Sequence, residues 1–142
     1  MHGTPHPLMR RAAFGGRMID SMPATHYGAA RRWFGFSGAI LAAGSVALSA
    51  YASHAAGGAG QASLYIAAAI AFGHGIALTA LPHLARRRLA VIALVAMLLG
   101  VALFSGGLVI AHATGAPART APFGGSLLIA AWLAWAIDAL RS

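Results

Sequence analysis

A long stretch without any charged side chain restricts the fold of this chain more than any other feature. No Asp, Glu, Lys or Arg occurs between Trp33 and Ala85, and these four residue types make up 8% of the chain, against about 25% in soluble domains. A hydrocarbon core about 30 Å thick is crossed by about 20 helical residues, so this stretch can cross a membrane twice with a short turn between the crossings. We therefore expect an integral membrane protein.

Apolar runs predict four membrane-spanning helices, at about residues 34–53, 62–82, 89–112 and 123–140. Helices are expected because backbone polar groups in lipid must be satisfied internally, and the runs lack the alternation of barrel strands. The predicted fold class is all-α, an integral membrane four-helix bundle over residues 33–142. A basic cytoplasmic arm containing Gly and Pro precedes it over residues 1–32.

The arginines predict the orientation of these helices. All ten basic residues are Arg, giving a formal net charge of +8, and only Arg119 lies on the side of the 54–61 and 113–122 turns. The arginine bias predicts that both termini lie in the cytoplasm. Nucleic acid is not an expected partner, because the arginines lie between apolar runs rather than on a soluble module. We expect the lipid bilayer and its anionic headgroups to be partners of the arginines that flank the spans, Arg31, Arg32, Arg86, Arg87, Arg88 and Arg141.

Two short targeting matches give an alternative interpretation of the first span. RRWF at 31–34 matches the core of a twin-arginine signal, and AYA at 50–52 has the form of a cleavage site. We favour a permanent helix, with the Arg pair anchoring its cytoplasmic end.

An ordered set of short segments carries a family resemblance. The segments are SAYASHAA (49–56), AFGHGIAL (71–78), LFSGG with ATG (103–107 and 113–115), and TAPFGGSLLIAAW (120–132). Over about 38–140 the chain resembles the YgdD-like family of small bacterial inner-membrane proteins, a domain of unknown function that is similar to a small mitochondrial transmembrane protein. The resemblance implies a four-helix membrane fold, location in the bacterial inner membrane and no established activity. Gly107 and Val109 depart from the Ser and Tyr of the family pattern, and His112 falls outside it.

Rows of small residues at four-residue spacing predict close helix packing. Such rows allow the helices of one compact bundle to pack closely, or they allow a partner helix to dock. The rows are Ala69, Gly73 and Ala77 in the second span, Ala102 and Gly106 in the third, and Ser126, Ala130 and Ala134 in the fourth. The residues Gly115, Pro122, Gly124 and Gly125 are expected to make the last turn and begin the fourth helix.

Polar residues within or beside the spans are the candidate functional groups. His54 and His112 lie near the outer surface and in principle can ligate haem or a metal, but we favour interfacial hydrogen bonding because no carboxylate accompanies them. His74 is predicted to bond a helix carbonyl, Ser105 or Thr79, or else to form a proton or quinone site. Asp138 is predicted to pair with a nearby arginine, and Trp132 and Trp135 to pack against lipid or a neighbour.

The sequence predicts no enzyme, because it contains no nucleophile elbow, phosphate-binding loop, paired carboxylate or zinc motif. We expect no catalytic residue, metal or cofactor. The favoured function is a structural or accessory subunit of a larger membrane complex, respiratory or photosynthetic, that docks through small-residue helix faces and the N-terminal arm. The alternative is a small transporter or a proton- or quinone-binding protein centred on His74.

Overall fold

The computed structural model of the chain describes residues 25–54 and 58–141. The chain divides into two compact units, Met1–Ala30 and Arg31–Ser142. Of the first unit, only residues 25–30 are described, and they are helical. The rest of the predicted N-terminal arm, including Arg10, Arg11 and Arg17, lies outside the described residues.

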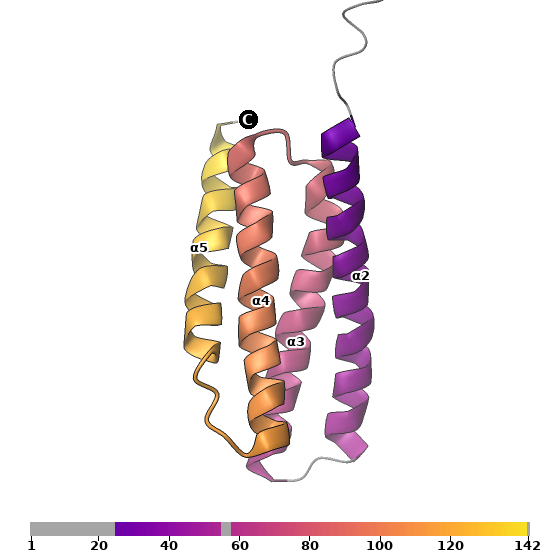
Figure 1. Cartoon of the computed structure of the whole chain (residues 1–142), viewed down its shortest axis with the longest axis vertical. Helices are drawn as coiled ribbons and strands as arrows, with labels where there is room; N and C mark the ends of the chain where they lie inside the picture. The colour runs from indigo at the N-terminus through magenta and orange to yellow at the C-terminus, as the bar shows by residue number, and fades with distance from the viewer. Residues whose placement is uncertain (1–24, 55–57, 142) are drawn as a thin grey trace, which may run out of the picture. The chain divides into compact units, whose positions relative to one another are not determined.

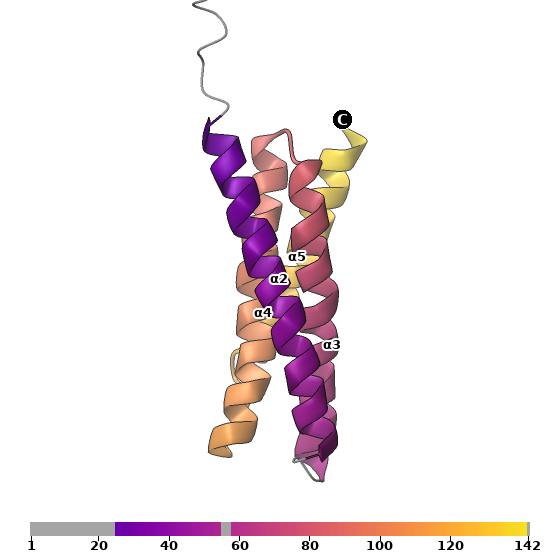
Figure 2. The ribbon, with the colours of Figure 1, turned by 90° about the vertical axis from the view of Figure 1, so that its right-hand side faces the viewer.

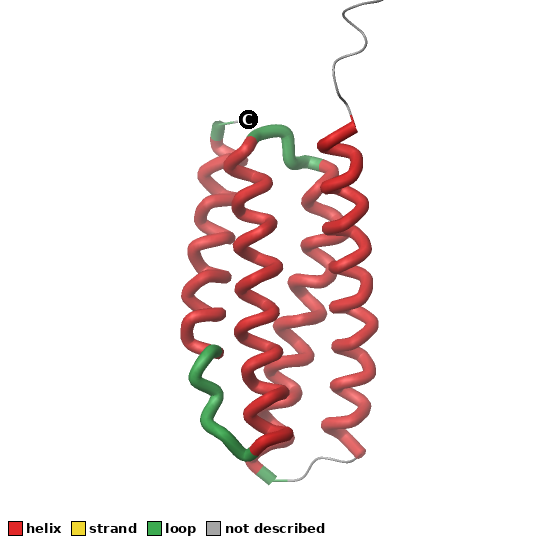
Figure 3. The backbone as a smooth tube through the Cα atoms, in the orientation of Figure 1, coloured by secondary structure: helices red, strands yellow, loops and turns green. Residues whose placement is uncertain are grey.

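Four long helices account for most of the described residues (Figure 1). They are α2 (Thr25–His54), α3 (Ala59–Ala80), α4 (Arg88–Thr114) and α5 (Ala121–Leu140), and a short 3-10 helix η1 (Leu81–His83) follows α3. All four are long and apolar enough to cross a membrane. In Figure 3 the described backbone consists of helix and loop alone, which confirms the predicted all-α class.

The helices extend further than hydropathy predicts. α2 begins at Thr25 rather than near residue 34, and α4 continues to Thr114 rather than ending near 112. Arg31 and Arg32 interrupt the apolar run but do not interrupt the helix, because Arg has a high helix propensity. Hydropathy locates the part of a helix that lies in hydrocarbon, whereas the hydrogen-bonded helix continues into the headgroup region.

The connection between α4 and α5 is shorter than expected. Gly115 ends α4 in the left-handed conformation, with φ of 70°, which glycine adopts without steric cost. Pro122 stands in the first turn of α5, where its missing N–H leaves no hydrogen bond unmade. Gly124 and Gly125 therefore lie within α5, not in the turn.

In the second unit α4 packs against α3 on one side and α5 on the other (Figure 1). α2 runs beside α3, as the second view shows (Figure 2), and a Cβ placed on Gly38 of α2 would lie 2.5 Å from the carbonyl oxygen of Gly75 in α3. The central core is small and apolar, consisting of Ala71, Leu78, Leu94, Met97, Val101, Leu128 and Ala131. The structure is thus a four-helix membrane bundle held by close backbone approach.

Large apolar side chains point outward from every helix. Ile40, Ile66, Ile92 and Ile129 are each more than half exposed, one on each of the four helices. A soluble protein exposes few such contiguous apolar faces, whereas a lipid-facing surface consists of them. The surroundings of these helices are therefore expected to be the hydrocarbon of a bilayer.

Candidate functional site

His74 forms a polar link between α3 and α5. Its Nδ1 lies 2.7 Å from the Ile70 carbonyl oxygen, and its Nε2 lies 3.1 Å from the indole Nε1 of Trp132. A carbonyl can only accept and an indole N–H can only donate, so Nδ1 carries the proton and Nε2 accepts. The neutral imidazole thus has both nitrogens hydrogen-bonded, one within its helix and one to α5.

The bond from His74 to a helix carbonyl was predicted, and that carbonyl is the one of Ile70. The second partner, Trp132, was not predicted from the sequence. Ser105 and Thr79, the other predicted partners of His74, bond elsewhere: Ser105 donates to the Ala67 carbonyl at 2.9 Å and Thr79 to the Ile76 carbonyl at 2.7 Å. The available signal for Trp132 was its indole N–H, which in hydrocarbon requires an acceptor.

A groove of about 460 Å³ lies beside this His74–Trp132 pair. Its walls come from α3 and α5, with Phe104 of α4 also contributing. The imidazole and the indole are its polar groups, and the remaining lining residues are apolar: Ile70, Phe104, Gly125, Leu128, Ile129 and Leu133. We call it the α3–α5 groove.

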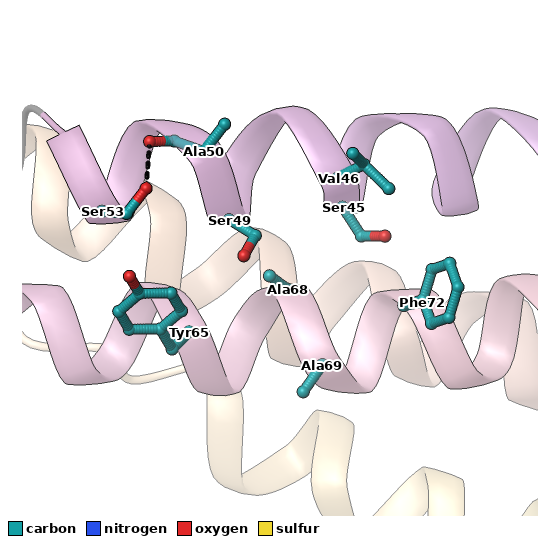
Figure 4. Close-up of a pocket in the computed structure, with 9 residues that line it drawn as sticks. All are labelled: Ser45, Val46, Ser49, Ala50, Ser53, Tyr65, Ala68, Ala69 and Phe72. Carbon is teal, nitrogen blue, oxygen red and sulfur yellow. Dashed lines mark hydrogen bonds between the residues drawn. The ribbon is translucent and has the colours of Figure 1, made fainter.

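A second groove, of about 670 Å³, lies between α2 and α3 (Figure 4). We call it the α2–α3 groove; it is lined by Ser45, Val46, Ser49, Ala50 and Ser53 of α2 and by Tyr65, Ala68, Ala69 and Phe72 of α3. Three serines, one per helical turn, line the α2 wall. This row of serines was not predicted from the sequence.

The two outer histidines have different surroundings among the described residues. His112 faces Tyr51 of α2 edge-on, with ring centroids 6.2 Å apart, and its Nδ1 would lie 2.6 Å from a Cβ placed on Gly60. His54 is exposed at the end of α2. Within residues 25–54 and 58–141, no group of three His, Cys, Asp or Glu side chains is placed to hold a metal ion.

Asp138 is buried near the C-terminal end of α5, with 7% of its surface exposed. Its backbone carbonyl accepts the N–H of Arg141 at 3.0 Å, which ends the helix. The expected side-chain pairing of Asp138 with an arginine stays a prediction.

The small-residue rows lie mainly on the outside of the bundle. Ala69, Gly73, Ala102, Ser126 and Ala130 are exposed, and Ala77 and Ala134 are half-buried. Among the described residues, no atom beyond its own helix lies within 4 Å of a Cβ placed on Gly73 or Gly106. Gly73 and Gly106 therefore make no close contact with another described helix, whereas Ala77 packs against the core, and docking of these rows to a partner stays a prediction.

Other glycines make the close contacts instead. A Cβ on Gly124 would overlap the backbone nitrogen of Phe104, and one on Gly107 would overlap the Thr120 hydroxyl. Thr120 also donates to the Leu103 carbonyl at 3.2 Å. α4 and α5 thus meet along a seam of glycines that sequence spacing alone did not identify.

The arginines that flank the spans lie at one end of the second unit, which we call the arginine end. There the guanidinium of Arg31 donates to Nδ1 of His83 in η1, joining α2 to the end of α3. The others, Arg32, Arg86, Arg87, Arg88 and Arg141, are exposed at the same end, where the α3–α4 connection and the C-terminus lie (Figure 1). Arg119 belongs to the α4–α5 connection at the opposite end.

Comparison with known proteins gives one family. The family described as Protein of unknown function (DUF423) matches residues 48–125. That range includes the end of α2, all of α3 and α4, and the first residues of α5, so it contains His74 but not Trp132. No curated protein and no solved structure gives a significant match.

Proposed function

The chain belongs to the DUF423 family of proteins of unknown function, and we propose that it is a non-catalytic accessory subunit of a larger membrane protein complex. The complex would be respiratory or photosynthetic and embedded in the bacterial inner membrane. The subunit would dock through a helix face within the bilayer, and its N-terminal arm would add contacts on the cytoplasmic side.

The observation that carries this proposal is a face of α3 that is exposed in the part of the chain that the structure describes. Its residues are exposed and either small or aliphatic, and their spacing alternates between four and three: Ala62, Ile66, Ala69, Gly73, Ile76 and Ala80. We call this face the α3 ridge. Alternating spacings of four and three are typical of a seam between helices, and small residues at the centre of such a seam allow backbones to approach closely in a membrane.

Small residues are poorly suited to face lipid alone, because they offer acyl chains little surface for van der Waals contact. The α3 ridge also runs between the two grooves, since Ala69 lines the α2–α3 groove and His74 lines the α3–α5 groove. A partner helix seated on Ala69 and Gly73 would have larger side chains beside it to enter the α3–α5 groove. This shape supports docking of a helix.

The test is gentle detergent extraction followed by native mass determination of the chain with whatever it retains. We expect a reproducible larger complex from the wild-type chain and its loss in Gly73→Leu, which places a large side chain at the centre of the α3 ridge. Gly44→Leu is the matched control, because Gly44 is also exposed, lies on α2 and has open space around it. A wild-type chain that is recovered alone or as a homo-oligomer would refute the proposal.

A second candidate function is binding of a quinone-like ligand at His74, and the α3–α5 groove favours it. A quinone carbonyl is an acceptor that can take the Trp132 indole N–H, and the groove volume of about 460 Å³ lies within the usual range for small-molecule sites. Proton transfer through His74 fits less well, because a proton on Nε2 is incompatible with donation from Trp132. Trp132→Phe should abolish quinone binding, and His74→Gln should keep the chain assembled and abolish substrate-dependent proton movement in liposomes; unchanged quinone binding and proton movement remove this candidate.

A further inference from the structure

The α2–α3 groove is closed at both ends by contacts between its two helices. Toward the arginine end the backbones touch at Gly38 and Gly75. Toward the other end the Gln61 side chain donates to the Ala52 carbonyl at 2.9 Å. Between these contacts the helices leave a space of about 670 Å³ that opens sideways, toward the bilayer.

Two of the four hydroxyl groups in this groove have no hydrogen-bond acceptor among the described residues. Ser45 and Ser53 donate to the Ala42 and Ala50 carbonyls of their own helix, at 2.7 and 2.8 Å, and Figure 4 marks the Ser53 bond. The hydroxyls of Ser49 and Tyr65, on opposite walls, have no such bond to any described residue. A hydroxyl at the edge of the hydrocarbon, where water is scarce, is costly unless an acceptor is supplied, so these two groups favour a ligand that brings one.

The depth of these hydroxyls indicates which acceptor is available. The 30 residues of α2 span roughly 45 Å, about the full thickness of a bilayer with its headgroups. Ser49 lies five residues before the end of α2 and Tyr65 six residues after the start of α3, so they are roughly 7.5 and 9 Å inside a helix end. That depth is close to the boundary between headgroups and hydrocarbon, where the ester carbonyls of a glycerolipid lie.

The remaining lining fits an acyl chain and no charged group. Beyond Ser49, toward the arginine end, the walls consist mainly of Val46, Ala68, Ala69 and Phe72. None of the described residues that line the groove is charged, so a phosphate would find no cation there. A neutral carbonyl, by contrast, can accept from Ser49 or Tyr65 while its chain follows the apolar wall.

We propose that the α2–α3 groove is a lipid site, in which Ser49 and Tyr65 hold an ester carbonyl of a glycerolipid and the apolar wall holds one acyl chain. The site does not depend on the accessory-subunit function, because the purified chain alone contains it. A helix of a partner protein is the competing occupant, and the experiment separates the two.

The test compares a diester phosphatidylglycerol with its diether analogue carrying the same chains, each added to the purified full-length chain and quantified by native mass spectrometry. The wild-type chain is expected to retain the diester about fivefold better, the equivalent of roughly one hydrogen bond. Tyr65→Phe and Ser49→Ala should each reduce that preference, and the double variant should abolish it. Tyr51→Phe, a tyrosine on α2 outside the groove, should leave the preference unchanged.

A third variant tests the steric part of the site. Ser49→Phe fills the groove and should lower retention of both lipids. Equal retention of diester and diether lipid by the wild-type chain would overturn the proposal, and so would an undiminished preference in the double variant. Loss of a co-purifying protein in Ser49→Phe, with no change in lipid retention, would also overturn it and assign the groove to a partner helix.

Discussion

Hydroxyl side chains on these helices usually bond to their own backbone. Ser45, Thr79 and Ser126 each donate to a carbonyl three or four residues earlier, at 2.7 to 3.0 Å. Such bonds satisfy the hydroxyl without a second helix. Two bonds differ because they join separate helices: Ser105 of α4 bonds to α3, and Trp132 of α5 bonds to His74 of α3. These interhelical bonds can specify which faces meet.

The His74–Trp132 bond is expected to contribute modestly to stability. Interhelical hydrogen bonds in membrane proteins have an average coupling energy of about 0.6 kcal/mol, because side chains in the unfolded chain also find partners. A double-mutant cycle with His74→Phe and Trp132→Phe should give a coupling of that size in the free energy of unfolding, measured by titration with sodium dodecyl sulfate. Trp33→Phe, on an exposed residue of α2, should be additive with His74→Phe. Additive effects of His74→Phe and Trp132→Phe would show that the bond contributes nothing.

At the scale of helix pairs, the α4–α5 contact depends on Gly124. A Cβ at this position would overlap the Phe104 backbone nitrogen and lie 2.8 Å from the Gly100 carbonyl oxygen, so the two helices must move apart to admit it. Gly124→Ala should therefore lower the free energy of unfolding by about 1–3 kcal/mol, the usual cost of overpacking. The same detergent titration measures this change.

Gly106→Ala is the matched control for Gly124→Ala. Gly106 lies in α4, and no described atom beyond its own helix lies within 4 Å of the Cβ position. Alanine is favoured over glycine in a helix interior, so this substitution should stabilise the protein by roughly 0.5–1 kcal/mol. The change in the free energy of unfolding should therefore have opposite signs at Gly124 and Gly106. Equal changes would contradict the close contact of α4 and α5 at Gly124.

Hydropathy predicts the spans of this chain but not the direction in which each helix faces. Adjacent or near-adjacent glycines show the reason: Gly73 is exposed while Gly75 touches α2, and Gly106 is in open space while Gly107 contacts Thr120. These helices are apolar on every side, so no polar face marks the outside. Four-residue spacing occurs on several faces of an Ala- and Gly-rich helix, and only the packed structure selects one. The partner of His74 was not predicted either, because Trp132 lies on another helix, far along the chain, and sequence does not show which helix faces meet.

On the scale of the whole described chain, few large side chains are fully buried. The largest are Leu64, Leu78, Leu94, Met97, Val101 and Pro82, while many isoleucines and aromatic residues face outward. Lipid tails are as apolar as Leu, so the bilayer supplies no hydrophobic force between helices, and close packing and interhelical hydrogen bonds must hold them together. Close contacts at glycines therefore contribute much of the stability that a large hydrophobic core contributes in a soluble protein.

The arginine end predicts the orientation of the molecule in its membrane. Positively charged residues beside spans are retained on the cytoplasmic side, so this end should face the cytoplasm and the α4–α5 connection should face the periplasm. The chain contains no cysteine, which allows single cysteines to be placed without background. Leu84→Cys, in the connection after η1, and Ala116→Cys, in the α4–α5 connection, are both exposed positions that leave every arginine in place.

A membrane-impermeant maleimide applied to intact bacterial cells with a permeabilised outer membrane should label Ala116→Cys and not Leu84→Cys. Lysis should then make Leu84→Cys reactive, because reagent reaches the inner face of the membrane. Replacing Arg86, Arg87 and Arg88 together with Gln should weaken this preference and yield a mixed population, since the charges themselves set the orientation. If Leu84→Cys is labelled first in intact cells, the arginine end lies outside, and contacts with anionic lipid or with a partner on the cytoplasmic side have to be sought at the opposite end of the helices.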